Sequence, residues 1–386
     1  MQKYQQSANT EQVYNKANSF TDIAGSTNNS GTLKRIRHLY DNIGSIPSNF
    51  RAVVKQACSD IFNKPNHEER LFTLQKMVLA EIDRLEDKNL ARYLNYRYRY
   101  DIYPQDKKID DFPPCVQIEP TSICNYRCVF CYQTDKNLTQ GKHGHMGMMS
   151  LDLFKNIIDQ IEGNVEAVTL ASRGEPLMAK SIIPMLMYAS KKFLAFKINT
   201  NASFLNEEKI HALLSAEPNT LVFSADAADS DLYAKLRVNG DLDKVVSNIK
   251  LFSDIRQKHY PQNKTIVRVS GVRYSKEQHF EDIEKFWGRY TDQVAFVSYN
   301  PWESAYDAQT NNIQDHCSDL WRRTFVWWDG TINPCDVDYR STLAVGNIRR
   351  ELLTDVWQGS KYHNLRNLHS NKRRCEITPC NGCILV

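Results

Sequence analysis

Long apolar runs are missing from this chain of 386 residues. A membrane-spanning helix needs roughly 18 or more consecutive apolar residues. No stretch reaches that length, so we expect no membrane partner. The N-terminal residues MQKYQQSANTEQ contain no apolar segment of the kind that secretory signals carry. Together these absences predict a cytoplasmic protein, in a compartment where thiols stay reduced.

A strong excess of charge of one sign is also absent. A net charge of +4 over this length is weak and argues against a dedicated nucleic-acid binder. The run YLNYRYRYDIY at 93–103 interleaves aromatic and basic residues, which could stack on nucleic acid. We favour the interpretation that it is an edge segment packed against the main domain, so nucleic acid is not an expected partner.

Cysteine, by contrast, is plentiful, with ten residues. In a reducing compartment this number indicates metal binding or catalysis rather than disulfides. Three of the thiols, Cys124, Cys128 and Cys131, crowd into the stretch TSICNYRCVFCYQTD. Soft thiolates select zinc, copper(I) or iron–sulfur clusters, but a structural zinc site takes four ligands. A four-iron cluster held by three thiolates leaves one iron open to another ligand, which would explain a set of only three.

Strand-like and helix-like segments alternate through the middle of the chain. The apolar runs lie at 115–119, 167–172, 194–200, 220–226, 265–272 and 293–299, and amphipathic helical segments separate them. Six βα repeats with short loops predict a parallel sheet with right-handed crossovers. Active sites assemble at the C-terminal ends of such strands, and the three-cysteine stretch directly follows the first strand.

The first hundred residues follow a different pattern. Residues 1–32 are polar and predicted to be poorly ordered, and 33–110 are predicted to form a helical extension. Its clearest helix is expected to start at PNHEERLF, where Asn66 can cap and Glu69 completes a capping box. An apolar stripe at helical spacing follows, and we expect it to pack on the main domain. Its members are Leu71, Leu74, Val78, Ile82 and Leu85.

Residues 300–386 form the last predicted unit. The segment TFVWWDGTINPCDVD reads as a hairpin turning at Asp329-Gly330, and a short helix is expected near LLTDVWQ. Four cysteines of this unit could close a structural zinc site or hold a fully ligated iron–sulfur cluster. They are Cys317, Cys335, Cys380 and Cys383. Because the unit has too little apolar content for a strong core of its own, a metal site would help to stabilise it.

The spacing of Cys124, Cys128 and Cys131, with the aromatic Phe130 before the last cysteine, resembles the cluster loop of the radical S-adenosylmethionine (SAM) superfamily. The resemblance covers about residues 115–386. It implies an α/β fold with a partial (β/α)6 TIM-like barrel at 111–299, and a [4Fe–4S] cluster whose open iron binds SAM. In that family an electron from the reduced cluster cleaves SAM to a 5′-deoxyadenosyl radical, which abstracts a hydrogen atom from the substrate. It also implies an external electron donor, such as flavodoxin or ferredoxin.

Later segments resemble the SAM contacts of the same family. In SRGEPLM, Gly174, Glu175 and Pro176 match the family's GGEP motif, while Arg173 replaces its first glycine. Further SAM ligands are implied at the ends or on the face of the following strands, namely Asn199, Thr200, Asn201, Ser224, Asp226, Arg268 and Gly271. Arg268 matches an arginine often used for the SAM carboxylate, with an inward-pointing salt bridge as the alternative.

The C-terminal unit resembles the SPASM and twitch extensions of the superfamily. The number of cysteines fits the shorter twitch form with one auxiliary [4Fe–4S] cluster, and zinc is the alternative. Cys375 is left over in this scheme, either as a spare thiol or as a replacement for one of the four ligands.

The resemblance therefore implies a radical SAM enzyme that oxidises a small polar molecule, such as a sugar, an aminocyclitol or a nucleotide-sugar, with the auxiliary cluster accepting an electron. Arg268, Glu119 and Tyr299 are the candidate catalytic residues. Modification of a ribosomal peptide or a protein side chain is the alternative. A non-catalytic zinc or electron-transfer protein is a third class.

Overall fold

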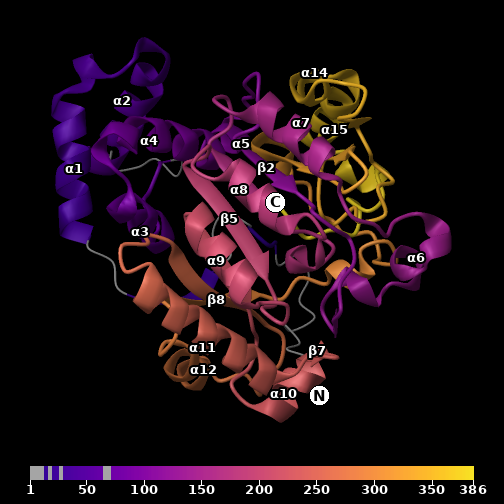
Figure 1. Cartoon of the computed structure of the whole chain (residues 1–386). Helices are drawn as coiled ribbons and strands as arrows, with labels where there is room; N and C mark the ends of the chain where they lie inside the picture. Colours follow the sequence, from indigo (N-terminus) through magenta and orange to yellow (C-terminus); the bar gives the residue numbers. More distant parts are fainter. Residues whose placement is uncertain (1–12, 16–19, 26–28, 64–70) are drawn as a thin grey trace.

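The computed structural model describes residues 13–15, 20–25, 29–63 and 71–386 (Figure 1). Its central element is a ten-stranded sheet with the order β1-β9-β8-β6-β5-β4-β2-β10-β11-β12. The six neighbours from β9 to β2 pair with one another only in parallel. They are β2 (Cys115–Ile118), β4 (Ala167–Leu170), β5 (Ala195–Thr200), β6 (Thr220–Ser224), β8 (Ile266–Arg273) and β9 (Gln293–Ser298).

Each of these six strands coincides with one of the predicted apolar runs, so the predicted partial (β/α)6 barrel is confirmed. Polar residues start the connecting helices: Ser150, Asn206 and Asp241 each accept a hydrogen bond from a backbone N–H in the first helical turn. The outer helices include α7 (Leu151–Ile161), α8 (Ile182–Ala189), α9 (Glu207–Ala216), α10 (Ser230–Leu236), α11 (Leu242–His259) and α12 (Phe280–Trp287). Their apolar faces join the main core.

The helical extension covers the N-terminal ends of the barrel strands (Figure 1). It consists of α1 (Asn29–Asp41), α2 (Ser48–Phe62), α3 (Lys76–Arg84), α4 (Asp87–Asp101) and α5 (Tyr103–Asp106). These helices share a second core with Cys115 and Ala167, which are the first residues of β2 and β4. No helix in the described ranges is both long and apolar enough to cross a membrane.

The predicted start of the third helix is only partly correct. The capping box at Asn66 and Glu69 lies outside the described residues, and Leu71 and Leu74 precede α3, which begins at Lys76. The predicted stripe nevertheless packs inward, since Val78 and Ile82 are fully buried in the second core.

The aromatic and basic run at 93–103 is helical rather than an edge segment. It falls largely within α4, with Tyr93, Tyr96 and Tyr100 buried. Its packing against the barrel is as we expected, and three of its aromatic rings are therefore not exposed for stacking on nucleic acid.

The N-terminal segment contradicts the prediction of poor order wherever it is described. Strand β1 (Phe20–Ala24) pairs antiparallel with β9 and closes one edge of the sheet. Tyr14 pairs with Leu385 near the C-terminus, through backbone hydrogen bonds of 2.7 Å to Ile384 and 3.2 Å from Val386. Backbone pairing, which composition does not reveal, holds this polar segment in place.

The C-terminal unit continues the same sheet. Strand β10 (Arg323–Val326) pairs in parallel with β2 and forms the predicted hairpin with the antiparallel β11 (Thr331–Asn333), which in turn pairs with β12 (Gly346–Asn347). Two helices, α14 (Leu353–Gln358) and α15 (Ser360–Ser370), complete it. Several of its buried aromatic residues, Trp321 and Trp357 among them, belong to the main core. The expectation of a separate, weak core is therefore wrong.

Candidate iron–sulfur and SAM site

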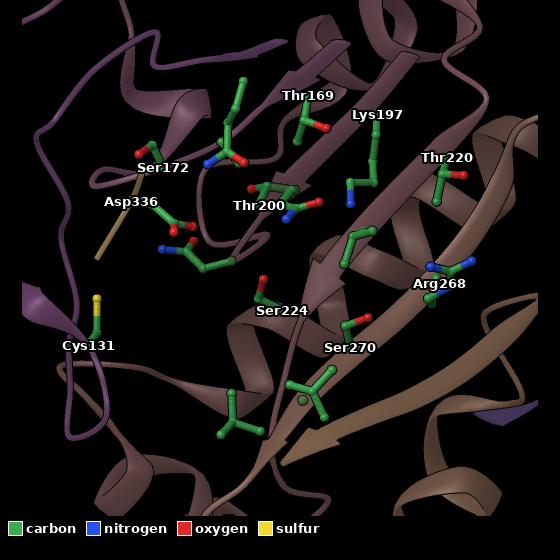
Figure 2. A pocket seen from close by; sticks show the side chains of 18 of the residues that line it. Cys131, Thr169, Ser172, Lys197, Thr200, Thr220, Ser224, Arg268, Ser270 and Asp336 are labelled. Carbon is green, nitrogen blue, oxygen red and sulfur yellow. The ribbon is translucent and has the colours of Figure 1, made fainter. Parts of the chain in front are cut away.

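The three cysteines of the loop after β2 line one cavity of about 490 Å³ within the barrel (Figure 2). Burial raises the pKa of Cys124 to about 12, and the nearby carboxylate of Glu175 adds to the rise. The pKa of Cys131 is raised first by burial and then by its neighbours Cys128 and Cys124. The three thiols are therefore close enough to influence one another, and they need a cation to become thiolates.

A close backbone contact joins the cysteine loop to the loop after β4. The Glu175 N–H donates to the Ile123 carbonyl at 2.9 Å. A Cβ on Gly174 would lie 2.3 Å from the Thr121 carbonyl oxygen and 2.6 Å from that of Ile123. Only glycine fits at this position, so the close contact between the two loops explains why residue 174 is the glycine of the family's motif.

The Glu175 carboxylate is held at the cavity wall by three donors. They are the Thr200 hydroxyl at 2.6 Å, the Asn201 N–H at 2.7 Å and the Leu177 N–H at 3.0 Å. Burial raises the pKa of this carboxyl, and the three hydrogen bonds oppose the rise. The loops after β4 and β5 thus meet at one carboxylate, which is suited to binding an amine.

Most of the predicted SAM ligands line this cavity. They are Phe130, Gly174, Glu175, Asn199, Thr200, Asn201, Ser224, Arg268 and Gly271. Pro176 starts a short 3-10 turn and does not line it. A Cβ on Gly271 would meet the Phe296 ring at 2.4 Å, so strand packing is sufficient to explain that glycine.

Asp226 is placed differently from the prediction. Its fully buried carboxylate forms an ion pair of 2.5 Å with Arg237 and accepts the Val272 N–H at 2.6 Å, and it does not line the cavity. Arg237 does line it, and one guanidinium nitrogen lies 3.8 Å from the Cys128 sulfur. Asp226 therefore positions an arginine beside the cysteine loop.

Glu119 is also engaged elsewhere. It forms a two-point ion pair with Arg173, at 2.6 and 2.7 Å, and both side chains are almost wholly buried. Arg173 also donates to the Tyr339 carbonyl at 2.9 Å and lies over the Trp327 ring. The residue that replaces the family's first glycine thus links the barrel to the C-terminal unit. Glu119 is unsuitable as a catalytic base for two reasons: its carboxylate is held in this ion pair, and it does not line the cavity.

The other two candidate catalytic residues, Tyr299 and Arg268, have different surroundings. The Tyr299 hydroxyl donates to Glu303, and its side chain does not line the cavity. Arg268 lines the cavity, but near the N-terminal end of β8, where its charge interacts with Glu81 and Tyr93 of the helical extension. Figure 2 shows Arg268 at the opposite side of the pocket from Cys131. This location does not fit an arginine on the methionine part of a cluster-bound SAM.

Sequence reasoning missed Asp336. This residue follows Cys335 in the C-terminal unit, is 5% exposed and lines the cavity within the barrel. In Figure 2 it lies on the same side of the pocket as Cys131. Its position directly after a predicted ligand is the only sequence signal that could have indicated it.

The four C-terminal cysteines gather in one place although they come from three distant segments. The raised pKa of Cys335 results first from burial and then from Asp336, Cys317, Cys383 and Cys380. None of the four thiols lines the barrel cavity. Cys375 is exposed and is not among the causes of the raised pKa of Cys317, Cys335 or Cys380, so whether it is a spare thiol or a replacement ligand stays a prediction.

Both thiol sets supply the soft sulfur ligands that iron–sulfur clusters take. In the described part of the chain, no three His, Cys, Asp or Glu side chains converge on a point that could hold one metal ion. A four-iron cluster binds each thiolate through a different iron, so its ligands lie further apart than those of one zinc ion. Backbone N–H groups also point at the sulfurs, from Val337 to Cys335 at 3.1 Å and from Tyr126 to Cys124 at 3.5 Å.

The barrel cavity contains three thiols, and four further thiols gather beside it in the C-terminal unit. This is the arrangement of an iron–sulfur protein whose three-thiol cluster can bind another ligand inside the barrel. The sequence model of the radical SAM superfamily matches residues 118–286, and that of an iron–sulfur cluster-binding domain, SPASM, matches residues 317–384. The chain therefore contains a radical SAM domain followed by a SPASM iron–sulfur domain. Its two domains imply [4Fe–4S] clusters and SAM as cofactors.

Curated relatives match only in part. An uncharacterised protein of Methanocaldococcus jannaschii is 24% identical over 178 residues, which are 46% of this chain and 54% of that protein. The chain spans 54%, 65% and 38% of the lengths of three curated relatives that it matches.

One solved structure with a TM-score of 0.50 supports the fold. Streptococcus suis SuiB bound to S-adenosylmethionine has a TM-score of 0.50 at 17% identity, over 83% of this chain and 82% of that one. BtrN in complex with AdoMet and 2-DOIA has a TM-score of 0.48 at 17% identity, over 72% of this chain and 94% of that one. At these identities the likeness concerns the fold alone.

Proposed function

We propose that this protein is a radical SAM oxidoreductase that oxidises a small polar molecule inside its barrel. The observation that carries the proposal is the continuous cavity that joins the thiols of Cys124, Cys128 and Cys131 to polar side chains deep in the barrel. A cavity of about 490 Å³ has the size of a small-molecule site.

The three loop cysteines are the proposed ligands of the SAM-binding cluster. When bound, that cluster supplies the electron that converts SAM to methionine and a 5′-deoxyadenosyl radical. Glu175, held by its three donors, would accept hydrogen bonds from the SAM amine. Asn199, Asn201 and Ser224 at the ends of β5 and β6 would bind the nucleoside part.

Asp336 is our candidate for the side chain that orients the substrate. Three acidic residues line the cavity, namely Glu81, Glu175 and Asp336. Of these three, Asp336 lies on the same side of the pocket as Cys131, whereas Glu81 belongs to helix α3 of the helical extension and Glu175 lies at the proposed SAM amine (Figure 2). Asp336 would accept a hydrogen bond from a substrate hydroxyl next to the cysteine loop.

The auxiliary site would serve electron transfer. Cys317, Cys335, Cys380 and Cys383 are its proposed ligands, and a fully ligated cluster accepts and passes on single electrons. Cys335 is adjacent in sequence to the cavity-lining Asp336, so the closed site lies directly behind the cavity wall. An external electron donor of the flavodoxin or ferredoxin type would complete the redox cycle.

Modification of a peptide side chain is the second candidate. BtrN was solved with 2-DOIA and SuiB with the precursor peptide SuiA, so the solved relatives include both kinds of ligand. The small molecule is favoured because helices α3 and α4 line the cavity at the N-terminal ends of the strands and so close it there.

The reductive cleavage of SAM tests the proposal. Replacing Cys124, Cys128 and Cys131 together by Ala should abolish 5′-deoxyadenosine formation by the anaerobically reconstituted protein, measured by chromatography with mass detection. Cys58→Ala, a buried thiol of the helical extension, is the matched control. Continued 5′-deoxyadenosine formation by the triple variant would refute the proposal, and its absence from the unaltered protein would favour a non-catalytic protein.

A further inference from the structure

The inward face of the barrel is polar at a depth where barrels of this kind are filled by branched apolar side chains. Side chains alternate along a strand, and alternate residues such as Cys115 and Gln117 of β2 or Ala195, Lys197 and Asn199 of β5 line the cavity, together with some of their neighbours. The inward residues at this depth define what we call the deep chamber. They are Gln117, Thr169, Lys197 and Thr220, which are in register, together with Arg268, whose backbone pairs two residues further along β6, with Val222, and whose side chain lies on the same side of the pocket in Figure 2.

Arg268 is the most unusual member of the deep chamber. Its side chain is 2% exposed, and its Nε donates to the neutral Gln293 amide at 2.9 Å. One terminal nitrogen, Nη2, has no hydrogen-bond partner among the described residues. Its guanidinium lies 5.3 Å from the centre of the Phe20 ring. A buried guanidinium with an unsatisfied donor is costly for the fold, which indicates that a ligand completes it.

The chamber wall carries a second cation and further donors. Lys197 pairs in register with Thr169 on one side and Thr220 on the other, so an ammonium group and two hydroxyls lie at one level of the barrel. Figure 2 shows these residues and Arg268 on the side of the pocket away from Cys131. Ammonium, guanidinium and hydroxyl groups are the side chains that bind phosphate and carboxylate oxygens.

Other charged residues near the chamber are engaged with one another. Arg97 pairs with Asp101 at 2.9 Å, and Arg323 lies 3.4 Å from Asp319. The Glu81 carboxylate, which interacts electrostatically with Arg268, accepts the Tyr93 hydroxyl. These pairs leave Arg268 without an ion pair among the described residues. Helices α3 and α4 cover this end of the cavity, and exclusion of water strengthens the attraction of an anion.

We propose that the deep chamber binds an anionic group of the substrate, a phosphate or a carboxylate, through Arg268 and Lys197. This inference rests on the proposed function and narrows its substrate class from small polar molecules to small anionic ones. The anion would lie far from the cysteine loop and would direct the rest of the molecule towards it. Substrate carbon atoms would then lie between the deep chamber and the proposed SAM site.

Direct binding of simple anions to the full-length reconstituted protein tests the inference. Inorganic phosphate and acetate are titrated separately by calorimetry at constant ionic strength, with chloride as the reference. At least one should bind to the unaltered protein, and the preferred probe distinguishes a phosphate from a carboxylate. Arg268→Gln should weaken that binding about tenfold or more, because a charge-assisted hydrogen bond is lost. Arg268→Lys should restore part of it, and Arg350→Gln, an exposed arginine of the C-terminal unit, is the control.

Thermal unfolding without added anion is a second measurement, and its result would differ if Arg268 had a purely structural role. Arg268→Gln should raise the melting temperature, since it removes a buried charge with an unsatisfied donor, and added phosphate or acetate should no longer raise it further. Equal anion binding by both proteins, or none by the unaltered protein, would overturn the inference. A raised KM for SAM with unaltered anion binding would instead assign Arg268 to the SAM carboxylate, and the proposed function would stand.

Discussion

The two cysteine sites of this protein are built from the same side chain but differ in what surrounds it. Burial raises the pKa of Cys124 in the barrel loop and of Cys317 in the C-terminal unit alike to about 12. The three barrel thiols face a cavity that can hold a small molecule, whereas none of the four C-terminal thiols lines it. The difference teaches that the number of thiols and the open space beside them together decide whether a cluster can bind a ligand or only exchange electrons.

The two sites are nevertheless parts of one wall. Arg173, next to the cysteine loop, reaches the Tyr339 carbonyl of the C-terminal unit at 2.9 Å. Tyr132 of the cysteine loop packs on the Tyr339 ring with centroids 5.2 Å apart, and Arg340 pairs with Asp135 at 2.6 Å. Contacts from both sides thus fix the position of the three-thiol site of the barrel relative to the four-thiol site of the C-terminal unit.

The largest expected effect comes from removing a ligand of the closed site. Cys335→Ala should reduce substrate oxidation by more than the roughly 10- to 100-fold that the loss of an outer-shell partner costs a metal site. Formation of 5′-deoxyadenosine should fall far less, because the barrel thiols are intact. Both products are measured in one anaerobic assay. Equal loss of the two would show that the sites do not have separate roles.

A smaller effect is expected from the ion pair that lies between the sites. Glu119→Gln should lower the free energy of unfolding by about 3–5 kcal/mol, because it leaves Arg173 buried beside a neutral group. Urea unfolding followed by circular dichroism measures this. The matched control is Arg373→Ala, which removes an exposed ion pair with Glu376 and should leave stability nearly unchanged. A stable Glu119→Gln protein that no longer oxidises substrate would restore Glu119 as a catalytic candidate.

The smallest effect is expected from the leftover thiol. Cys375→Ser should keep the full iron content, about eight irons per chain if both four-iron clusters form. Iron and zinc are measured by elemental analysis after anaerobic reconstitution, with Cys380→Ser as the comparison. Loss of about four irons from the Cys375 variant would make it a ligand, and about four irons plus one zinc in the unaltered protein would contradict a second cluster.

Several features were predictable because they depend on local sequence. The apolar runs identified the six barrel strands, since buried parallel strands are rich in apolar residues even where some inward positions are polar. Cysteine spacing identified the cluster loop, because its ligands come from one short segment. The hairpin turn at Asp329-Gly330 also followed from local chemistry, and Gly330 has a φ of +90° there.

The functional carboxylates and arginines were not predictable in the same way. Glu119 is paired with Arg173, 54 residues away, so its sequence position after β2 could not reveal that it is engaged. The strand position of Arg268 allows either a contact with the SAM carboxylate or an inward-pointing salt bridge, and only the structure reveals that its charge faces helices α3 and α4. Asp336 enters the cavity only because β10 joins the sheet beside β2.

The sequence by itself determined the barrel strands, the three-thiol loop and the superfamily, because each depends on the order and spacing of neighbouring residues. Only the tertiary structure decided which polar groups share the cavity, which are already paired, and that the C-terminal unit extends the barrel sheet. The physical reason is that ion pairs and cavity walls form between residues distant in the chain. Whether a buried charged side chain can bind a ligand or is already paired depends on every element packed around it.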